Sequence, residues 1–175
     1  MDLKNLTEGI GELISKKRSE IVFRQGEKDT GVYIVQAGLL KAYYLSADGK
    51  EHVKSFISEG SFISSLTAAY SKNSCSFTLS CLEDSDLIRL PFDRLQEAAL
   101  KDLELSKWVI THLLQLSMKK EKREYDFLSL SAEQRYEQFC REFQHIINRL
   151  TQYDIARYIG ITPVALSRIR SRRTQ

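Results

Sequence analysis

Arginine side chains gather at the C-terminal end of the chain, where their spacing could let them contact nucleic acid. From Leu150 to Gln175 there are five arginines and one acidic residue, Asp154. The whole chain carries a net charge of only +3, from 26 basic and 23 acidic residues. Guanidinium groups on the outer face of a helix suit the phosphates and base edges of the DNA major groove. The sequence therefore predicts a local DNA-binding surface rather than a generally basic protein.

Two short helices are predicted to position these arginines. Thr151 can cap the first helix in a capping box with Asp154, and Gly160 can end it. Thr162 can cap a second helix that begins at Pro163, because the first helical position needs no backbone N–H. A connection this short makes the two helices cross steeply, so the pattern is typical of a helix-turn-helix.

The two faces of the predicted second helix differ in character. Leu166 and Ile169 form its inner face, and the small Ala156 of the first helix lies at the crossing. The alternative is a solvated helix pair inside an ordinary helical bundle, but the capping residues, the small residues and the charged side agree with DNA contact. The predicted DNA contacts are Thr151, Gln152, Thr162, Pro163, Val164, Ser167, Arg168, Arg170 and Arg172.

Residues that could support metal binding or catalysis are scattered. The three cysteines, Cys75, Cys81 and Cys140, have no C-x-x-C spacing, and the three histidines stand far apart. This set predicts neither a disulfide framework nor a metal site. No catalytic triad or phosphate-cradling glycine loop is evident, so we expect no enzyme and no cofactor.

Length and hydropathy bound the possible architecture. The chain has 175 residues, of which 42% are hydrophobic, enough for one large or two small domains with real cores. We find no secretory signal pattern and no apolar run near the roughly 18 residues that a membrane span needs. We therefore expect a cytoplasmic protein that does not enter the membrane.

The N-terminal part of the chain changes from helical to β-type patterning. Apolar residues at helical spacing predict a leading helix over residues 2–18. Glycine-punctuated β-rich runs then predict an antiparallel unit, with Asp48-Gly49 as the turn of a hairpin. The predicted strands are Ile21–Arg24, Val32–Gln36, Leu39–Ser46, His52–Ile57, Ser76–Leu82 and Asp86–Leu90.

Helical patterns return after the β-type unit. We expect a short helix over 94–101 and a long one over about 104–126, on which Val109, Leu113 and Leu116 follow a four-three spacing. One face of the long helix can meet a second copy of itself in a homodimer, although an ordinary core helix is the alternative. The charged run 119–124 is predicted to carry this helix into solvent. Ser131 with Gln134 predicts a capping box for an amphipathic helix that packs beneath the helix-turn-helix.

Several motifs along the chain resemble those of the Crp/Fnr family of bacterial transcription regulators. The resemblance implies an α+β fold with an antiparallel β-roll (a double-stranded β-helix) over 1–102, a central dimerisation helix over 103–126 and a helix-turn-helix domain over 127–175. It also implies a homodimer that binds double-stranded DNA, with RNA polymerase as a candidate partner. The matching segments are Phe23–Glu27, Val32–Gly38, Asp48–Glu51, Gly60–Ile63 and Ile155–Arg170.

The chain departs from the family pattern at the effector pocket. Where cyclic-nucleotide-binding members have Gly-Glu and Arg-Ser/Thr pairs for the ribose and the cyclic phosphate, this chain has Ser64-Ser65 and Cys75-Ser76. A phosphate without its guanidinium loses charge-assisted hydrogen bonds of roughly 1.5–3 kcal/mol each, so tight binding of cyclic AMP is not expected. The pocket, predicted to include Phe62, could be empty, filled by aromatics such as Phe56, Phe62 or Tyr70, or occupied by another small-molecule effector.

The chain departs from the family pattern in two further places, its N-terminal part and its second C-terminal helix. The chain lacks the N-terminal cysteine cluster of the iron–sulfur oxygen sensors in the family. Its second helix has Pro163 and Val164 where family members that read well-known palindromes have Arg and Glu, while Arg168 keeps a later base-contacting place. We therefore expect a different operator, and a module that binds a ligand or partner without reading DNA is the alternative function.

Overall fold

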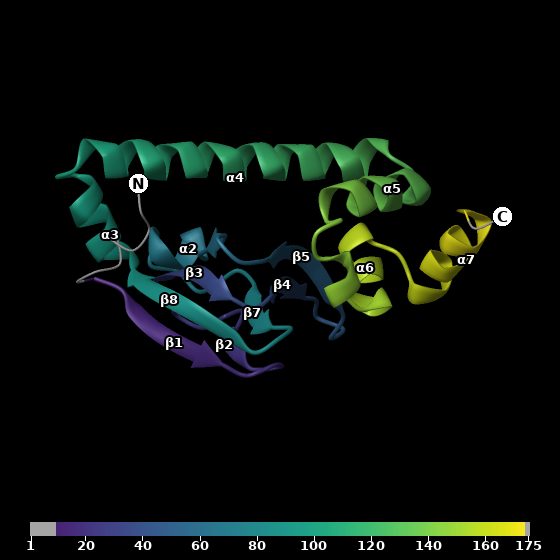
Figure 1. Ribbon diagram of the computed structural model, residues 1–175, viewed down its shortest axis with the longest axis horizontal. Helices are drawn as coiled ribbons and strands as arrows, with labels where there is room; N and C mark the ends of the chain where they lie inside the picture. The colour runs from purple at the N-terminus through teal and green to yellow at the C-terminus, as the bar shows by residue number, and fades with distance from the viewer. Residues whose placement is uncertain (1–9, 174–175) are drawn as a thin grey trace. The chain divides into compact units, whose positions relative to one another are not determined.

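The computed structural model describes residues 10–173, and the side chains of residues 10–172 (Figure 1). The chain forms two compact units, which divide between Val109 and Ile110. The first is built mainly of β-strands and the second of helices, so the α+β fold class is confirmed. None of the helices among the described residues is long and apolar enough to cross a membrane.

The first unit contains two four-stranded antiparallel sheets, the β-roll, whose strand orders are β1-β8-β3-β6 and β2-β7-β4-β5 (Figure 1). A four-residue helix, α2 (Leu66–Ala69), connects β6 to the segment before β7. The strands are β1 (Glu12–Lys16), β2 (Ile21–Phe23), β3 (Gly31–Ala37), β4 (Leu40–Leu45), β5 (Glu51–Ile57), β6 (Phe62–Ile63), β7 (Thr78–Cys81) and β8 (Ser85–Pro91).

The inner core of the β-roll lies between the two sheets. Both sheets contribute buried side chains, because successive residues of a strand point to opposite faces and the faces that the two sheets turn toward each other are apolar. Aromatic rings are prominent in this core: Phe23 lies 5.3 Å from Phe77 and 5.8 Å from Tyr33 between ring centroids. Its other buried members are Val35, Leu40, Ala42, Ile57, Ile63, Ala68, Cys75, Leu79, Cys81 and Leu87.

A second apolar cluster covers the opposite face of the β1-β8-β3-β6 sheet. Val32 and Ile34 of β3 alternate with the inner-core residues and point the other way. They pack with side chains of α3 (Phe92–Ala99) and the first turns of α4 (Leu103–Ser129), among them Leu95 and Leu105. The Asp102 carboxylate caps α4 by accepting hydrogen bonds from the backbone N–H groups of residues 104 and 105.

All six predicted strands are present, as β2, β3, β4, β5, β7 and β8, with ends that differ by up to two residues. The predicted hairpin turn at Asp48-Gly49 joins β4 to β5. Gly49 has a φ of 78°, which glycine adopts without strain, and Ser46 N–H donates to the carbonyl of Lys50 at 3.0 Å.

The prediction of a leading helix is wrong over residues 12–16, which form β1; residues 1–9 lie outside the described part of the chain. β1 pairs antiparallel with β8, from Glu12 opposite Arg89 to Lys16 opposite Ser85. Ile14 packs against the inner core from this position. Pairing with a strand some 70 residues away outweighs a local helical spacing that Gly11 already weakens.

The second unit consists of the rest of α4 followed by α5 (Ala132–Glu142), the 3₁₀-helix η1 (Ile147–Arg149), α6 (Gln152–Ile159) and α7 (Pro163–Arg173) (Figure 1). The predicted capping box at the start of α5 is confirmed, with Ser131 and Gln134 bonding reciprocally. The helix is shorter than its apolar stripe predicts, since Phe143 and Ile146 lie beyond its end. Phe143 still packs in the core, 4.8 Å from Phe139 and 5.1 Å from Tyr158.

Candidate nucleic-acid interface

Side-chain caps define the starts of both helices of the predicted helix-turn-helix. Thr151 accepts a hydrogen bond from the backbone N–H of Asp154 at 3.1 Å, and its hydroxyl donates to the Asp154 carboxylate at 2.5 Å. Thr162 accepts from the backbone N–H of Ala165 at 3.2 Å at the start of α7. Each cap satisfies an N–H group that has no partner inside its helix, so α6 and α7 begin where the sequence predicts.

The turn between α6 and α7 depends on a glycine. Gly160 adopts a left-handed conformation, with φ of 77° and ψ of 37°, and closes α6 by donating to the carbonyl of Ala156. The N–H of Ile161 also donates to that carbonyl, at 3.0 Å. A residue with a Cβ would be strained at this φ, which explains why glycine ends the helix.

Helix α7 buries one face and exposes the other. Leu166 is fully buried and Ile169 is 8% exposed, which confirms the predicted inner face. At about 100° of rotation per residue, Val164, Ser167 and Arg168 lie at the centre of the outer face. Arg170 and Arg172 project from the two flanks of that face. Both arginines, like Arg168, are exposed to solvent.

Most of the remaining predicted contacts are also exposed. Thr151, Gln152 and Thr162 are exposed at the starts of α6 and α7, and Pro163 is half-buried. The structure adds one residue that sequence reasoning missed. Tyr153, on the first turn of α6, is 62% exposed, and the guanidinium of Arg157 lies 6.0 Å from its ring. The one signal for it in the sequence is its place two residues after the capping Thr151.

The structure brings three of the five predicted effector-pocket residues together. Ser65 is buried, and its hydroxyl oxygen accepts from the backbone N–H of Ser76 at 3.3 Å and lies 3.2 Å from the hydroxyl of Thr67. Cys75 belongs to the inner core and donates its S–H to the carbonyl of Asp29 at 3.7 Å. Burial raises the pKa of the Cys75 thiol, so it stays neutral at ordinary pH.

The other two pocket residues lie differently. Ser64 is half-buried. Phe62 faces away from the inner core and packs on Trp108 of α4, with 5.6 Å between ring centroids. The structure therefore does not gather Phe62 with Ser65 and Cys75.

Aromatic side chains do fill the inner core, but not those suggested by the sequence. Phe62 packs outside it, Phe56 is buried elsewhere, and Tyr70 is 69% exposed. The filling rings are those of Phe23, Tyr33 and Phe77. Filling by Phe56, Phe62 or Tyr70 was one of three alternatives for the pocket, and none of these rings belongs to the inner core, whose rings come from β2, β3 and the segment before β7.

The hydroxyl of Tyr33, one of these three rings, has a hydrogen-bond partner. It donates to the Asp29 carboxylate at 2.8 Å. Burial, reinforced by the Asp29 carboxylate, raises the pKa of Tyr33 well above its usual value. The phenol therefore remains a neutral donor and keeps its ring in place across the physiological pH range.

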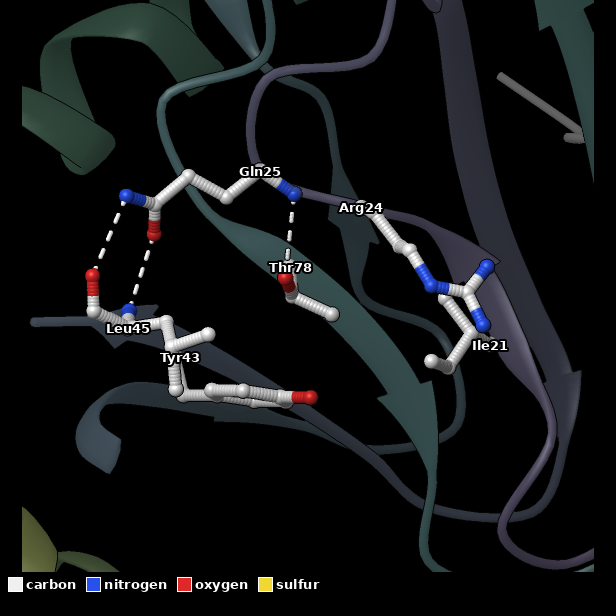
Figure 2. A pocket seen from close by; sticks show the side chains of 6 residues that line it. All are labelled: Ile21, Arg24, Gln25, Tyr43, Leu45 and Thr78. Atoms are coloured by element: carbon white, nitrogen blue, oxygen red, sulfur yellow. Dashed lines mark hydrogen bonds between the residues drawn. The ribbon is translucent and has the colours of Figure 1, made fainter. Parts of the chain in front are cut away.

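A surface pocket of about 220 Å³ lies on the opposite face of the β2-β7-β4-β5 sheet (Figure 2). The Gln25 side chain spans it, accepting from the N–H of Leu45 at 2.8 Å and donating to its carbonyl at 3.2 Å, while the Gln25 N–H donates to Thr78 (Figure 2). Arg24 forms an exposed ion pair with Glu27 at 3.8 Å. These polar groups bond to one another, so the pocket is a stabilised loop junction rather than a preformed ligand site.

Helix α4 carries apolar side chains that its own chain leaves uncovered. Of the residues predicted for a dimer seam, Leu113 is 44% exposed, while Val109 and Leu116 are half-buried. An ordinary protein surface exposes apolar residues singly, whereas this helix exposes several in one stripe. Ile110, Leu114 and Met118 widen the exposed set.

No group of three or more His, Cys, Asp or Glu residues that could hold a metal ion is found between residues 10 and 173.

Comparisons with known proteins agree with this architecture. The family model described as "Cyclic nucleotide-binding domain" matches residues 13–102, just over half of the chain. The anaerobic regulatory protein of Haemophilus influenzae is 26% identical over 171 residues, covering 89% of this chain and 64% of its own length. The transcriptional activator protein Anr of Pseudomonas protegens is 28% identical over 170 residues, covering 89% and 68%.

The chain belongs to the Crp/Fnr family. Its cyclic nucleotide-binding domain is the β-roll described above, and the chain spans about 64% of the length of the Haemophilus relative.

Solved structures share the fold of this Crp/Fnr chain. FixK2 from Bradyrhizobium japonicum superposes with a TM-score of 0.82 at 19% identity, over 93% of this chain and 84% of its own. The c-di-GMP-responsive regulator CLP of Xanthomonas campestris gives 0.76 at 14% identity, over 98% and 90%. The likeness covers the β-roll, the long helix and the C-terminal helices.

Proposed function

We propose that this Crp/Fnr chain is a sequence-specific DNA-binding transcription regulator that acts as a homodimer. The observation that carries the proposal is helix α7, which presents Arg168 on an exposed outer face above the buried Leu166 and Ile169. The relatives named as an anaerobic regulatory protein and a transcriptional activator support the same function.

The exposed residues suit distinct roles on DNA. Arg168, at the centre of the outer face, can donate to the O6 and N7 of a guanine, and Val164 can contact a thymine methyl group. Arg170 and Arg172 on the flanks are placed for phosphates. Thr151 and Thr162 add helix N-termini, where backbone N–H groups favour an anionic phosphate. Gln152, Pro163 and Ser167 complete the contact surface.

A homodimer through α4 would present two recognition helices to a partly palindromic site, about one DNA turn apart. In this arrangement Val109, Leu113 and Leu116 form the seam, the segment 103–126 serves as the dimerisation element, and 1–102 and 127–175 serve as its sensor and DNA-binding domains. RNA polymerase is the partner through which such a regulator acts, in the cytoplasm.

Selection of binding sites from random duplexes, followed by a salt titration, tests the proposal. A DNA reader enriches a two-fold motif, and its affinity falls steeply with salt because bound cationic side chains displace counterions. No enriched motif and an affinity independent of salt would contradict the proposal and favour a module that binds only a ligand or a protein.

Arg168→Ala sharpens this test. If Arg168 contacts a base, the substitution weakens binding to the selected site by roughly 1–3 kcal/mol and relaxes the preference at one base pair. Electrophoretic mobility shifts with the selected site and with single-base variants measure both effects. The matched control is Arg94→Ala, which removes an exposed arginine of α3 in the first unit and should leave DNA affinity unchanged.

A further inference from the structure

Two arginines from different helices cap the C-terminal end of α6. Arg123 of α4 donates from Nη2 to the carbonyl of Tyr158, and Arg135 of α5 donates from Nε to the carbonyl of Ile159, both at 3.0 Å. Carbonyls in the last turn of a helix lack partners within the helix and lie at the negative end of its dipole, where a cation is favourable. The two guanidiniums therefore hold α6 where the turn to α7 begins.

Arg135 also connects this turn to the end of α4. Its Nη1 donates at 2.7 Å to the carbonyl of Leu130, which directly follows Ser129, the last residue of α4. One planar guanidinium thus bonds the last carbonyl of α6 and the first carbonyl after α4, a geometry that its fixed fork of donors allows and a lysine cannot reproduce.

Phe127, in the last turn of α4, fills the space against the helix-turn-helix turn. A Cβ atom placed on Gly160 would lie 2.7 Å from its ring, closer than real contacts allow. The guanidinium carbons of Arg123 and Arg135 lie 4.9 Å and 5.0 Å from the centre of the same ring, and Arg123 lies 4.0 Å from that of Tyr158. These cation–π contacts join Arg123, Phe127, Arg135 and Tyr158 into one packed set around the turn at Gly160, which we call the Gly160 clamp.

The clamp shows one exception to an expectation from the sequence. The charged run 119–124 was expected to carry α4 into solvent, and its residues are exposed except Arg123, which is half-buried against Tyr158. Because Arg123 and Tyr158 are 35 residues apart, the local charge pattern gives no sign of the contact.

We infer that Arg123, Phe127 and Arg135 are positioning residues that set which spacing of DNA half-sites the protein accepts. The inference rests on the proposed function. The exposed stripe around Leu113, the clamp and α7 all belong to the compact unit that begins at Ile110. In a dimer joined through that stripe, the clamp fixes the offset of each recognition helix from the two-fold axis, and that offset determines the distance between half-sites.

Phe127→Ala and Arg135→Ala test this inference. We compare affinities for the selected palindrome with those for duplexes in which one base pair is inserted or removed between the half-sites. The wild type should prefer one spacing. In each variant the ratio of the affinity for that spacing to the affinity for the altered spacings should fall about tenfold, a typical size for the coupling between contacting residues. Loss of stability alone would lower binding to every spacing by the same factor and leave the ratios unchanged.

Conservative and control variants separate positioning from charge. Arg135→Lys keeps one cationic donor and should retain more of the spacing preference than Arg135→Ala. Arg141→Ala removes an exposed arginine in the last turn of α5, outside the clamp, and should keep the wild-type ratios. Arg123→Ala is the second clamp variant if Phe127→Ala does not fold, as judged by circular dichroism.

A measurement without DNA distinguishes failure of this inference from failure of the proposed function. Nitroxide labels at Gln115→Cys in α4 and Ser171→Cys in α7, in a Cys140→Ser background diluted with unlabelled chain, report their separation by pulsed electron paramagnetic resonance. The intact clamp should give a narrow distance distribution, and the clamp variants a broad one. Unchanged distributions together with unchanged spacing ratios would overturn the inference. A broadened distribution in a chain that selects no DNA motif would overturn the proposed function and, with it, the role in half-site spacing, but would leave the positioning of α7 by the clamp in place.

Discussion

Gly160 performs two tasks at a single position. Its φ of 77° is one that residues with a Cβ rarely adopt, and its missing side chain leaves room for the Phe127 ring. The first requirement follows from the sequence, since a glycine just before a capped helix predicts a left-handed turn. The second depends on packing from a helix more than thirty residues away, so only the structure reveals it.

Gly160→Ala should therefore destabilise the protein by about 2–5 kcal/mol, the sum of a left-handed Cβ penalty of about 1–2 kcal/mol and an overpacked contact of about 1–3 kcal/mol. Gly49→Ala is the matched control. Gly49 has a nearly identical φ of 78°, but no atom lies within 4 Å of its added Cβ, so only the penalty of about 1–2 kcal/mol remains.

Urea unfolding followed by circular dichroism compares the two alanine variants. Equal losses of stability would mean that the Phe127 ring moves aside without cost. In a double-mutant cycle, Gly160→Ala should cost less stability in a Phe127→Ala background than in the wild type, since Phe127→Ala removes the atoms that the new Cβ meets.

The capping residues show what local sequence can predict at this scale. Ser131 and Thr162 act as caps in the structure because each one contacts backbone groups three residues away. The clamp arginines could not be found in the same way. A guanidinium that bonds a distant carbonyl has the same sequence signature as one that points into water.

Helix α4 is the element on which the proposed dimer depends. Its N-terminal turns pack on the β-roll through Leu105 and Trp108, which explains the half-burial of Val109. Further along, Ile110, Leu113 and Leu114 remain exposed. An exposed apolar stripe that continues from a buried one is typical of a helix with two partners.

Leu113→Glu should convert the proposed dimer to a monomer, because that dimer would bury an unpaired carboxylate at its seam. Analytical ultracentrifugation over a range of concentrations measures the change. Gln115→Glu introduces the same charge two residues further on, about 200° around the helix, and should leave the dimer intact. A Leu113→Glu chain that stays dimeric would place the interface elsewhere.

Strand β1 shows where element prediction fails. Its apolar residues fit a helix as well as a strand, and the deciding interaction is the ladder with β8, far along the chain. The hairpin of β4 and β5 was predictable because its turn chemistry is local, at Asp48 and Gly49. Very short elements such as β6 and α2 carry too few residues for any periodicity to appear.

At the scale of the whole molecule, the β-roll has the family architecture with altered chemistry inside. Sequence motifs were sufficient to predict the fold class, whereas the replacement of the family's Glu and Arg anchors by Ser64-Ser65 and Cys75-Ser76 stays a prediction. They did not predict that Phe23, Tyr33 and Phe77 would supply the aromatic filling, because the choice of inward face depends on strand register.

If the family's Glu and Arg anchors are replaced as the sequence predicts, cyclic AMP should leave this molecule unchanged. A ligand present at its dissociation constant raises the free energy of unfolding by only about 0.4 kcal/mol. If the dissociation constant for cyclic AMP exceeds about 1 mM, adding about 1 mM of the nucleotide should raise the melting temperature by less than about 2 °C. Differential scanning fluorimetry with an external dye measures the shift, and the affinity for the selected duplex should be the same with and without the nucleotide. A saturable rise in melting temperature would contradict this prediction.

The contact between Trp108 and Phe62 has one more consequence. Trp108 is the only tryptophan in the chain, and it lies half-buried where α4 meets β6. Its indole emission therefore reports on a single place in the β-roll, without any label. The emission can be followed while the unmodified protein is titrated with duplex DNA. A change of emission would mean that DNA binding at the C-terminal helices alters the β-roll. A constant emission would mean that the two units work independently.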